Sequence, residues 1–165
     1  MVLLITPDKY FVANAGDSRC VLFNKDKKVI HLSDDHKPDN EGEKKRIEQA
    51  GGVVSDGRIN GNLNLSRAIG DLEFKSNEKL DKNKQLIIAE PDVVERPLDK
   101  SESFFLMGCD GIWELKNAET LCKFIDESTE PLTTIVEKLL DSVLAEDTSE
   151  GTGCDNMSCI IVKMN

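Results

Sequence analysis

Short apolar runs separated by polar turns dominate the first part of the chain and predict antiparallel strands. Val2–Ile5 and Tyr10–Ala13 flank a four-residue turn that contains a proline, which predicts a β-hairpin. Arg19–Phe23 and Val29–Leu32 flank the polar stretch Asn24–Lys28 and predict a second hairpin. Because short turns join neighbouring strands, these segments are expected to form a meander in an antiparallel sheet.

Helical periodicity takes over later in the chain. Six apolar residues after Pro131 recur at helical spacing: Ile135, Val136, Leu139, Leu140, Val143 and Leu144. This spacing predicts an amphipathic helix from Leu132 to Glu146. Packing against a sheet is the favoured role of its apolar face, with a coiled-coil or partner-binding role as the alternative. A shorter helix is predicted over Asn40–Ala50, because two glycines follow directly and can end a helix. Another is predicted after Asn117, a residue whose side chain can cap the start of a helix.

Three aspartates lie where strand-like segments end. The apolar run Phe104–Gly108 leads to Asp110, the turn Gly153–Met157 contains Asp155, and Asp17 lies in a turn between two predicted strands. A carboxylate at the end of a buried strand loses hydration and needs a cation or strong donors nearby. Three such aspartates favour a divalent cation held by oxygen ligands. The alternative, that each aspartate only caps its turn, stays open.

The segments around these aspartates resemble a known family. Five motifs are similar, in the same order, to those of the PP2C-type metal-dependent protein phosphatases: Asn14–Arg19, Leu32–Pro38, Leu65–Asp71, Cys109–Trp113 and Asp155–Ser158. The resemblance covers essentially the whole chain, and the stretch from Leu139 to Met157 is most similar to the gamma-type branch. It implies an α+β fold, a layered β-sandwich of antiparallel strands with helices packed on the outside.

The resemblance also implies a metal-dependent reaction. The family hydrolyses phosphoserine and phosphothreonine in proteins through water activated by Mg²⁺ or Mn²⁺, with two or more ions in the complete domain. Asp110 and Asp155 match the aspartates that bind one of the paired metals, and Asp17 matches a ligand of a third, weaker position. At that third position the family often has an aspartate where this chain has Glu114, whose longer side chain leaves occupancy of the third position open.

The same resemblance suggests roles near the substrate. In the family, the region that corresponds to Glu73–Gln85 forms a variable flap beside the active site. Arg67 could contact a substrate near this flap, and Asp71 could accept a hydrogen bond close to the metals. An internal Arg–Asp ion pair is the favoured alternative for Arg67. His31 and His36 are each interpreted as making a structural hydrogen bond, with general-acid catalysis as the alternative.

Several family motifs do not occur in this sequence. The N-terminal half of the family carries a phosphate-binding arginine, a Glu-Asp pair and an Asp-Gly-His-Gly motif, whereas Asp110-Gly111 is followed here by Ile112. Residues 1–165 are therefore interpreted as the C-terminal portion of a single PP2C-like domain that is truncated at its N-terminus, either as a trimmed chain or as an incomplete gene model. This chain alone is expected to be inactive. The alternative is a non-catalytic pseudophosphatase or a truncated partner-binding module.

Composition narrows the expected partners and compartment. A formal net charge of −10 argues against nucleic-acid binding, because phosphate contacts need a basic surface. Bound divalent cations would reverse the local charge that a phosphorylated protein substrate meets. Five cysteines without ligand spacing argue against zinc and for a reducing, intracellular location, cytoplasmic or nuclear. No segment is long enough to span a membrane. Unpaired strand edges make a dimer possible.

Overall fold

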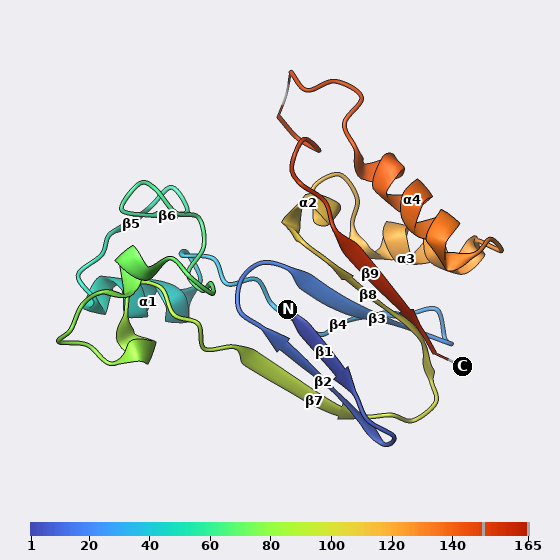
Figure 1. Ribbon diagram of the computed structural model, residues 1–165, viewed down its shortest axis with the longest axis horizontal. Coiled ribbons are helices and arrows are strands. Elements are labelled where there is room, and N and C mark those ends of the chain that lie inside the picture. The colour runs from blue at the N-terminus through green and yellow to red at the C-terminus, as the bar shows by residue number, and fades with distance from the viewer. Residues whose placement is uncertain (150, 165) are drawn as a thin grey trace.

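Two antiparallel sheets face each other in the computed structural model, which describes residues 1–149 and 151–164 (Figure 1). One sheet has the strand order β1-β2-β7 and the other the order β4-β3-β8-β9. Their strands are β1 (Val2–Ile5), β2 (Lys9–Asn14), β3 (Arg19–Asn24), β4 (Val29–His31), β7 (Asp92–Pro97), β8 (Glu102–Gly108) and β9 (Cys159–Lys163). All the pairings within these sheets are antiparallel. The predicted α+β sandwich with antiparallel strands is therefore confirmed.

Helices cover the outer face of the four-stranded sheet. The main helices are α1 (Glu41–Gln49), α2 (Asp110–Trp113), α3 (Ala118–Glu127) and α4 (Leu132–Val143). Figure 1 shows α3 and α4 on the side of this sheet that faces away from β1, β2 and β7. Helix α1 lies apart from them. Near it are a small sheet of two strands, β5 (Val54–Ser55) and β6 (Arg58–Ile59), and the 3₁₀ helices η1 (Leu72–Lys75) and η2 (Lys82–Lys84).

Strands β3 and β8 lie at the centre of the fold and are buried on both faces. Phe23 and Phe104 point toward the helices, where their rings stack with centroids 5.1 Å apart. Leu22 and Phe105 point toward the other sheet, where Phe105 meets Tyr10 edge to face at 5.0 Å. Burial of each such side chain stabilises the fold by about 1.5–3 kcal/mol. The alternation of side chains along a strand thus lets two strands supply both cores.

Both hairpins predicted from the sequence are present, but they lie in different sheets, so the predicted meander was wrong. Strand β1 pairs with β2, and β3 pairs with β4, across the expected turns. Helix α1 ends as predicted, with Gly51 at a positive φ of 89° that favours glycine. Helix α3 begins at Asn117, whose side chain accepts a hydrogen bond from the Thr120 N–H at 2.9 Å.

The predicted end of the last helix was wrong. Helix α4 ends at Val143 and not at Glu146, and Leu144 is extended and 59% exposed. The Ala145 N–H donates to the Gly153 carbonyl oxygen at 3.0 Å, so the chain leaves the helix to join the following loop. Tertiary hydrogen bonding has overridden the helical spacing of the apolar residues.

Each sheet ends in strands that have no second partner among the described residues. Strands β1 and β7 are the edges of one sheet, and β4 and β9 are those of the other. Val2, Leu4 and Ile160 on these edges are 62%, 56% and 57% exposed. Pairing of two chains through such edges stays a prediction. Within residues 1–149 and 151–164, no helix has the length and apolar character needed to cross a membrane.

Candidate metal and phosphate site

The turn that carries Asp110 lies directly against the turn that carries Asp155. The Cys109 N–H donates to the Ser158 carbonyl oxygen at 3.1 Å, and the Cys109 Sγ contacts the Asn156 carbonyl oxygen at 3.3 Å. Gly111 completes this contact, because a Cβ atom there would lie 2.7 Å from the Asn156 oxygen and 3.3 Å from the Asp155 Cβ. Two aspartates separated by 45 positions are thus brought together by a glycine that leaves room for the second turn.

Asp17 belongs to the same electrostatic neighbourhood. It is 9% exposed and forms an ion pair with Lys37. Partial loss of hydration, followed by the negative charges of Asp17 and Asp155, raises the pKa of Asp110. The Gly111 N–H and the Lys37 ammonium oppose this rise without cancelling it. A cation placed between these carboxylates would relieve their repulsion.

Asp110 and Asp155 are the two aspartates whose turns are packed together. Among the residues that the structure describes, no three His, Cys, Asp or Glu side chains converge closely enough to enclose a metal ion. Asp110 and Asp155 nevertheless offer hard carboxylate oxygens of the kind that Mg²⁺ and Mn²⁺ prefer. The arrangement can therefore supply part of a coordination shell.

Glu114 has a different environment from the three aspartates. Its Oε2 atom accepts a hydrogen bond from the Gly153 N–H at 2.7 Å. Gly153 has a φ of +72°, and a Cβ there would lie 2.6 Å from Leu115. In the described part of the chain, the Glu114 carboxylate therefore anchors the loop that leads to Asp155, and its role as a metal ligand stays a prediction.

Arg67 is held inside a network of acidic groups. Its Nη2 donates to Glu43 Oε1 at 2.8 Å, and its Nη1 donates to Asp92 Oδ1 at 2.7 Å. Arg67 makes an internal ion pair with an aspartate, but this aspartate is Asp92 and not the Asp71 of its own motif. Asp71 of the same motif is an exposed residue with a φ of +48° in the turn before η1. Contact between Arg67 and a substrate stays a prediction.

The environment of Glu43 favours its ionised form. Burial alone would raise the pKa of Glu43, but hydrogen bonds from Arg67 and Arg46 outweigh burial and lower it. Arg46 Nη1 lies 2.7 Å from Glu43 Oε2. Glu43 is therefore a charged bridge between helix α1 and the segment that carries Arg67.

His36 and Lys37 both contact the Gly16–Asp17 turn; the sequence predicted a structural hydrogen bond for His36 and no role for Lys37. Lys37 pairs with Asp17, and His36 is 3% exposed with hydrogen bonds to Gly16 and Asp92. The structural hydrogen bond expected for His36 is confirmed. The signal in the sequence was the dense run of charged residues that follows the apolar end of the second hairpin. His31, in contrast, is exposed and lies 3.9 Å from Glu119.

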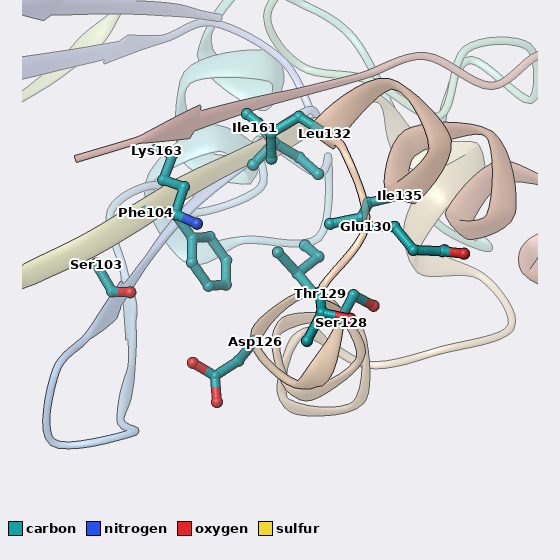
Figure 2. A pocket seen from close by; sticks show the side chains of 11 residues that line it. Ser103, Phe104, Asp126, Ser128, Thr129, Glu130, Leu132, Ile135, Ile161 and Lys163 are labelled. Atoms are coloured by element: carbon teal, nitrogen blue, oxygen red, sulfur yellow. The ribbon is translucent and has the colours of Figure 1, made fainter. Parts of the chain in front are cut away.

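A small cavity of about 160 Å³ lies elsewhere, below the turn between α3 and α4 (Figure 2). Phe104 and Ile161 contribute from the sheet, and Leu132 and Ile135 contribute from α4. None of the three aspartates lines this cavity. It is therefore separate from the candidate metal site.

Comparison with known proteins gives a consistent result. The family model described as "Protein phosphatase 2C" matches residues 1–152. Probable protein phosphatase 2C 6 of Paramecium tetraurelia is 53% identical over 165 residues, which cover 98% of this chain and 56% of the relative. Probable protein phosphatase 2C 21 of Arabidopsis thaliana is 50% identical, with 98% of this chain and 46% of the relative covered.

Solved structures agree with the sequence relatives. A phosphatase from a pathogenic strain of Toxoplasma gondii superposes with a TM-score of 0.81 at 32% identity, over 93% of this chain and 47% of that chain. A serine-threonine phosphatase 2C from Toxoplasma gondii has a TM-score of 0.76 at 21% identity, which supports the fold alone. The chain spans about half the length of the curated relatives that it matches. With the family model, the sequence relatives and the fold in agreement, the chain belongs to the protein phosphatase 2C family.

Proposed function

We propose that this chain is the C-terminal portion of a protein serine/threonine phosphatase domain that depends on Mg²⁺ or Mn²⁺. Its substrates are phosphoserine and phosphothreonine residues of proteins. The observation that carries this proposal is the close packing of the Asp110 and Asp155 turns through Gly111. The raised pKa of Asp110, caused by partial burial and then by Asp17 and Asp155, supports it, because repelling carboxylates are what a bound cation would stabilise.

The proposed metal-binding and substrate-binding roles fall on different residues of the chain. Asp110 and Asp155 supply carboxylate oxygens to one metal position, and Asp17 supplies one to a weaker position beside it. Glu114 is the second candidate for the weaker position, and its Oε1 could serve there while Oε2 keeps its bond to the Gly153 N–H. When bound, Mg²⁺ or Mn²⁺ lowers the pKa of water and neutralises charge on the phosphoryl group. Arg67 is a candidate for substrate contact, and its bonds to Glu43 and Asp92 support a structural role more directly.

We also propose that the chain belongs to the gamma-type branch of the family and that it works in a reducing, intracellular compartment. All five cysteines are free, which supports a reducing compartment. Burial raises the pKa of Cys20 and of Cys122 to about 12, so these thiols behave as small apolar groups.

The test compares the 165-residue chain with a longer protein that carries the remaining half of a relative's domain. With a phosphothreonine peptide and Mn²⁺, we expect no measurable turnover by the short chain and metal-dependent turnover by the longer one. In the longer protein, Asp110→Asn or Asp155→Asn should lower kcat/KM by at least about 100-fold, because each removes a metal ligand. Glu130→Gln, on the rim of the separate cavity, is the matched carboxylate-to-amide control and should leave turnover unchanged.

Two results would overturn this proposal. Chelator-sensitive turnover by the short chain would show that the absent motifs are dispensable. Full activity of the longer Asp110→Asn protein would remove Asp110 from the metal site.

A non-catalytic partner-binding module is the second candidate function. The ion pair between Lys37 and Asp17 favours it, because an internal ammonium can satisfy this carboxylate without a metal. This candidate expects the longer protein to bind partners and to remain inactive with Mn²⁺. The turnover assay therefore separates the two functions.

A further inference from the structure

His36 and Gly16 hold each other through the backbone and through the imidazole ring. The His36 N–H donates to the Gly16 carbonyl oxygen at 3.1 Å. The Gly16 N–H points at His36 Nδ1, also at 3.1 Å. The Asn14 Nδ2 adds a donor to the Gly16 oxygen at 3.0 Å. Both ends of Gly16, directly before Asp17, are therefore bonded inside the protein.

Asp92 determines which ring nitrogen of His36 carries the proton. His36 Nε2 lies 3.0 Å from Asp92 Oδ2, and an ionised carboxylate can only accept. Nε2 must therefore be the donor. The Gly16 N–H and the Gly16 carbonyl oxygen both lie 3.1 Å from Nδ1, so Gly16 alone fits either role of this nitrogen. In a neutral ring whose proton is on Nε2, Nδ1 is left as the acceptor of the Gly16 N–H.

Arg67 and Glu43 fix the orientation of Asp92. Arg67 Nη1 donates to the other Asp92 oxygen, Oδ1, at 2.7 Å, and Arg67 is itself held by Glu43 at 2.8 Å. A guanidinium has no acceptor, so the atom that faces it must stay an oxygen. Glu43 and Arg67 are largely buried, and through the exposed carboxylate of Asp92 this ion network sets the tautomer of His36.

We propose that His36, with its proton on Nε2 and its Nδ1 accepting from the Gly16 N–H, is a positioning residue that fixes the Gly16–Asp17 turn. It rests on the proposed function in that Asp17 is taken as a metal ligand. Lys37, the next residue, pairs with the Asp17 carboxylate. The two neighbours therefore hold Asp17 from different directions, His36 through the backbone and Lys37 through the side chain.

The first test is the ¹⁵N spectrum of the histidine rings in the 165-residue chain without metal. We expect His36 to show a protonated Nε2 and an unprotonated Nδ1. A proton on Nδ1, in either the other tautomer or the imidazolium, would overturn the proposal. This measurement needs no variant, so a substitution that fails to fold cannot block it.

Two substitutions of His36 separate its two bonds. In His36→Asn the amide oxygen can take the place of Nδ1 and accept from Gly16, whereas in His36→Gln the longer amide reaches toward Asp92. We expect hydrogen exchange of the Gly16 amide to rise about tenfold in His36→Gln and to stay near wild type in His36→Asn. His31→Asn, on the exposed histidine, is the control and should change nothing. Equal exchange in the Asn and Gln variants would indicate general packing and would overturn the proposal.

Asp92→Asn tests the tautomer without touching the ring. Because Arg67 needs an oxygen, the amide nitrogen should face His36 Nε2 and force the ring proton onto Nδ1. A proton on Nδ1 can be donated to the Gly16 carbonyl oxygen, which is also 3.1 Å away. The Gly16 N–H then loses its acceptor, and its exchange should rise as in His36→Gln. Unchanged exchange and an unchanged ring spectrum would contradict the mechanism.

Mn²⁺ separates failure of this proposal from failure of the proposed function. We expect the concentration that broadens the Asp17 amide by half to rise about tenfold in His36→Gln and not in His36→Asn. If Mn²⁺ leaves the wild-type Asp17 amide unchanged, the metal role of Asp17 fails, and with it the positioning of a metal ligand. The ring spectrum and the exchange rates then still decide whether His36 fixes the turn. Equal Mn²⁺ dependence in the Asn and Gln variants would show that the fixed turn does not serve metal binding.

Discussion

The sandwich and the region around helix α1 are stabilised by different means. Among the residues that the structure describes, thirteen buried residues form the apolar cluster between the four-stranded sheet and the helices, whereas three form the cluster beside α1. The small cluster consists of Ile47, Ile59 and Ile87. Because so few apolar groups are buried there, the α1 region depends more heavily on polar contacts.

Those contacts are a connected set of charges. Arg46, Glu43, Arg67 and Asp92 form successive ion pairs at 2.7–2.8 Å, and His36 joins Asp92 to Gly16. The three aspartates of the candidate metal site are held in place by parts of both regions. Asp110 begins α2 just after strand β8, and Asp155 lies in the turn just before strand β9. Asp17 follows Gly16, which His36 links to the charged set. The comparison teaches that one half of the site follows apolar packing and the other follows electrostatics.

Removal of a core aromatic should have the largest effect. Phe105 is fully buried between the sheets, so Phe105→Ala should lower the free energy of unfolding by about 3–5 kcal/mol. Urea unfolding followed by circular dichroism measures this change. Ile160→Ala, on exposed edge strand β9, is the control and should cost far less. A cost below about 1 kcal/mol for Phe105→Ala would contradict the assigned core.

Glu43→Gln tests the charged region while it keeps the side-chain volume. Loss of this charge leaves Arg67 and Arg46 without their shared partner, and we expect a cost of about 2–3 kcal/mol. Glu130→Gln removes the partner of Lys138 in an exposed pair and should cost below about 1 kcal/mol. Equal costs in the same urea assay would show that the buried network has no special role.

Acid should weaken the charged region before the apolar one. The pKa of Glu43 and the pKa of Asp92 are both lower than usual, because hydrogen bonds from Arg67 and its neighbours outweigh burial. A carboxylate of this kind contributes stability that is fully present above its ordinary pKa, 4.5 for Glu43 and 3.8 for Asp92, and is lost as the pH falls through the lower folded value.

Amide exchange measured from pH 7 downward tests this order. Ser66, whose N–H donates to the His36 carbonyl oxygen, should lose protection before Leu106 in strand β8. In Glu43→Gln the difference from wild type should shrink at low pH, where the wild-type carboxylate is also neutral. Simultaneous loss of protection in both regions would contradict the separation.

Removal of the Asp110 charge should stabilise the fold, in contrast to removal of the Glu43 charge. The pKa of Asp110 is raised by partial burial and by Asp17 and Asp155, so its ionised form is unfavourable in the folded chain without metal. Asp110→Asn should therefore raise the melting temperature slightly, by less than the equivalent of about 1 kcal/mol. Differential scanning calorimetry without and with Mn²⁺ checks this, and Asp147→Asn on an exposed loop serves as the control. A clear decrease for Asp110→Asn would show that the charge is well satisfied.

Local patterns in the sequence predicted much of the sandwich. The two hairpins depend on turn residues a few positions apart, and helix α3 depends on Asn117 within its own first turn. Strand β7 was not predicted. Val93 is 60% exposed and Val94 is only partly buried against the core, so the strand has a weak apolar pattern and its place beside β2 depends mainly on long-range backbone pairing.

In the candidate site too, the residues with a local sequence pattern were predicted and those that depend on long-range contacts were not. Asp17, Asp110 and Asp155 were identified because each ends a strand-like segment and matches a family motif. The partner of Arg67 was missed because Asp92 is 25 residues away and reaches it only when β7 is in place. Lys37 was missed because an ion pair with Asp17 leaves no pattern in the local sequence.

Binding of Mn²⁺ to Asp110 tests the central claim most directly. Amide spectra of the ¹⁵N-labelled 165-residue chain are recorded with increasing Mn²⁺, for wild type and for Asp110→Asn. We expect the Gly111 and Asn156 amides of wild type to broaden first, since both neighbour the paired aspartates. Asp110→Asn should need at least about tenfold more Mn²⁺ for the same effect. Equal broadening in the two proteins, or broadening that begins elsewhere, would contradict a metal site between Asp110 and Asp155.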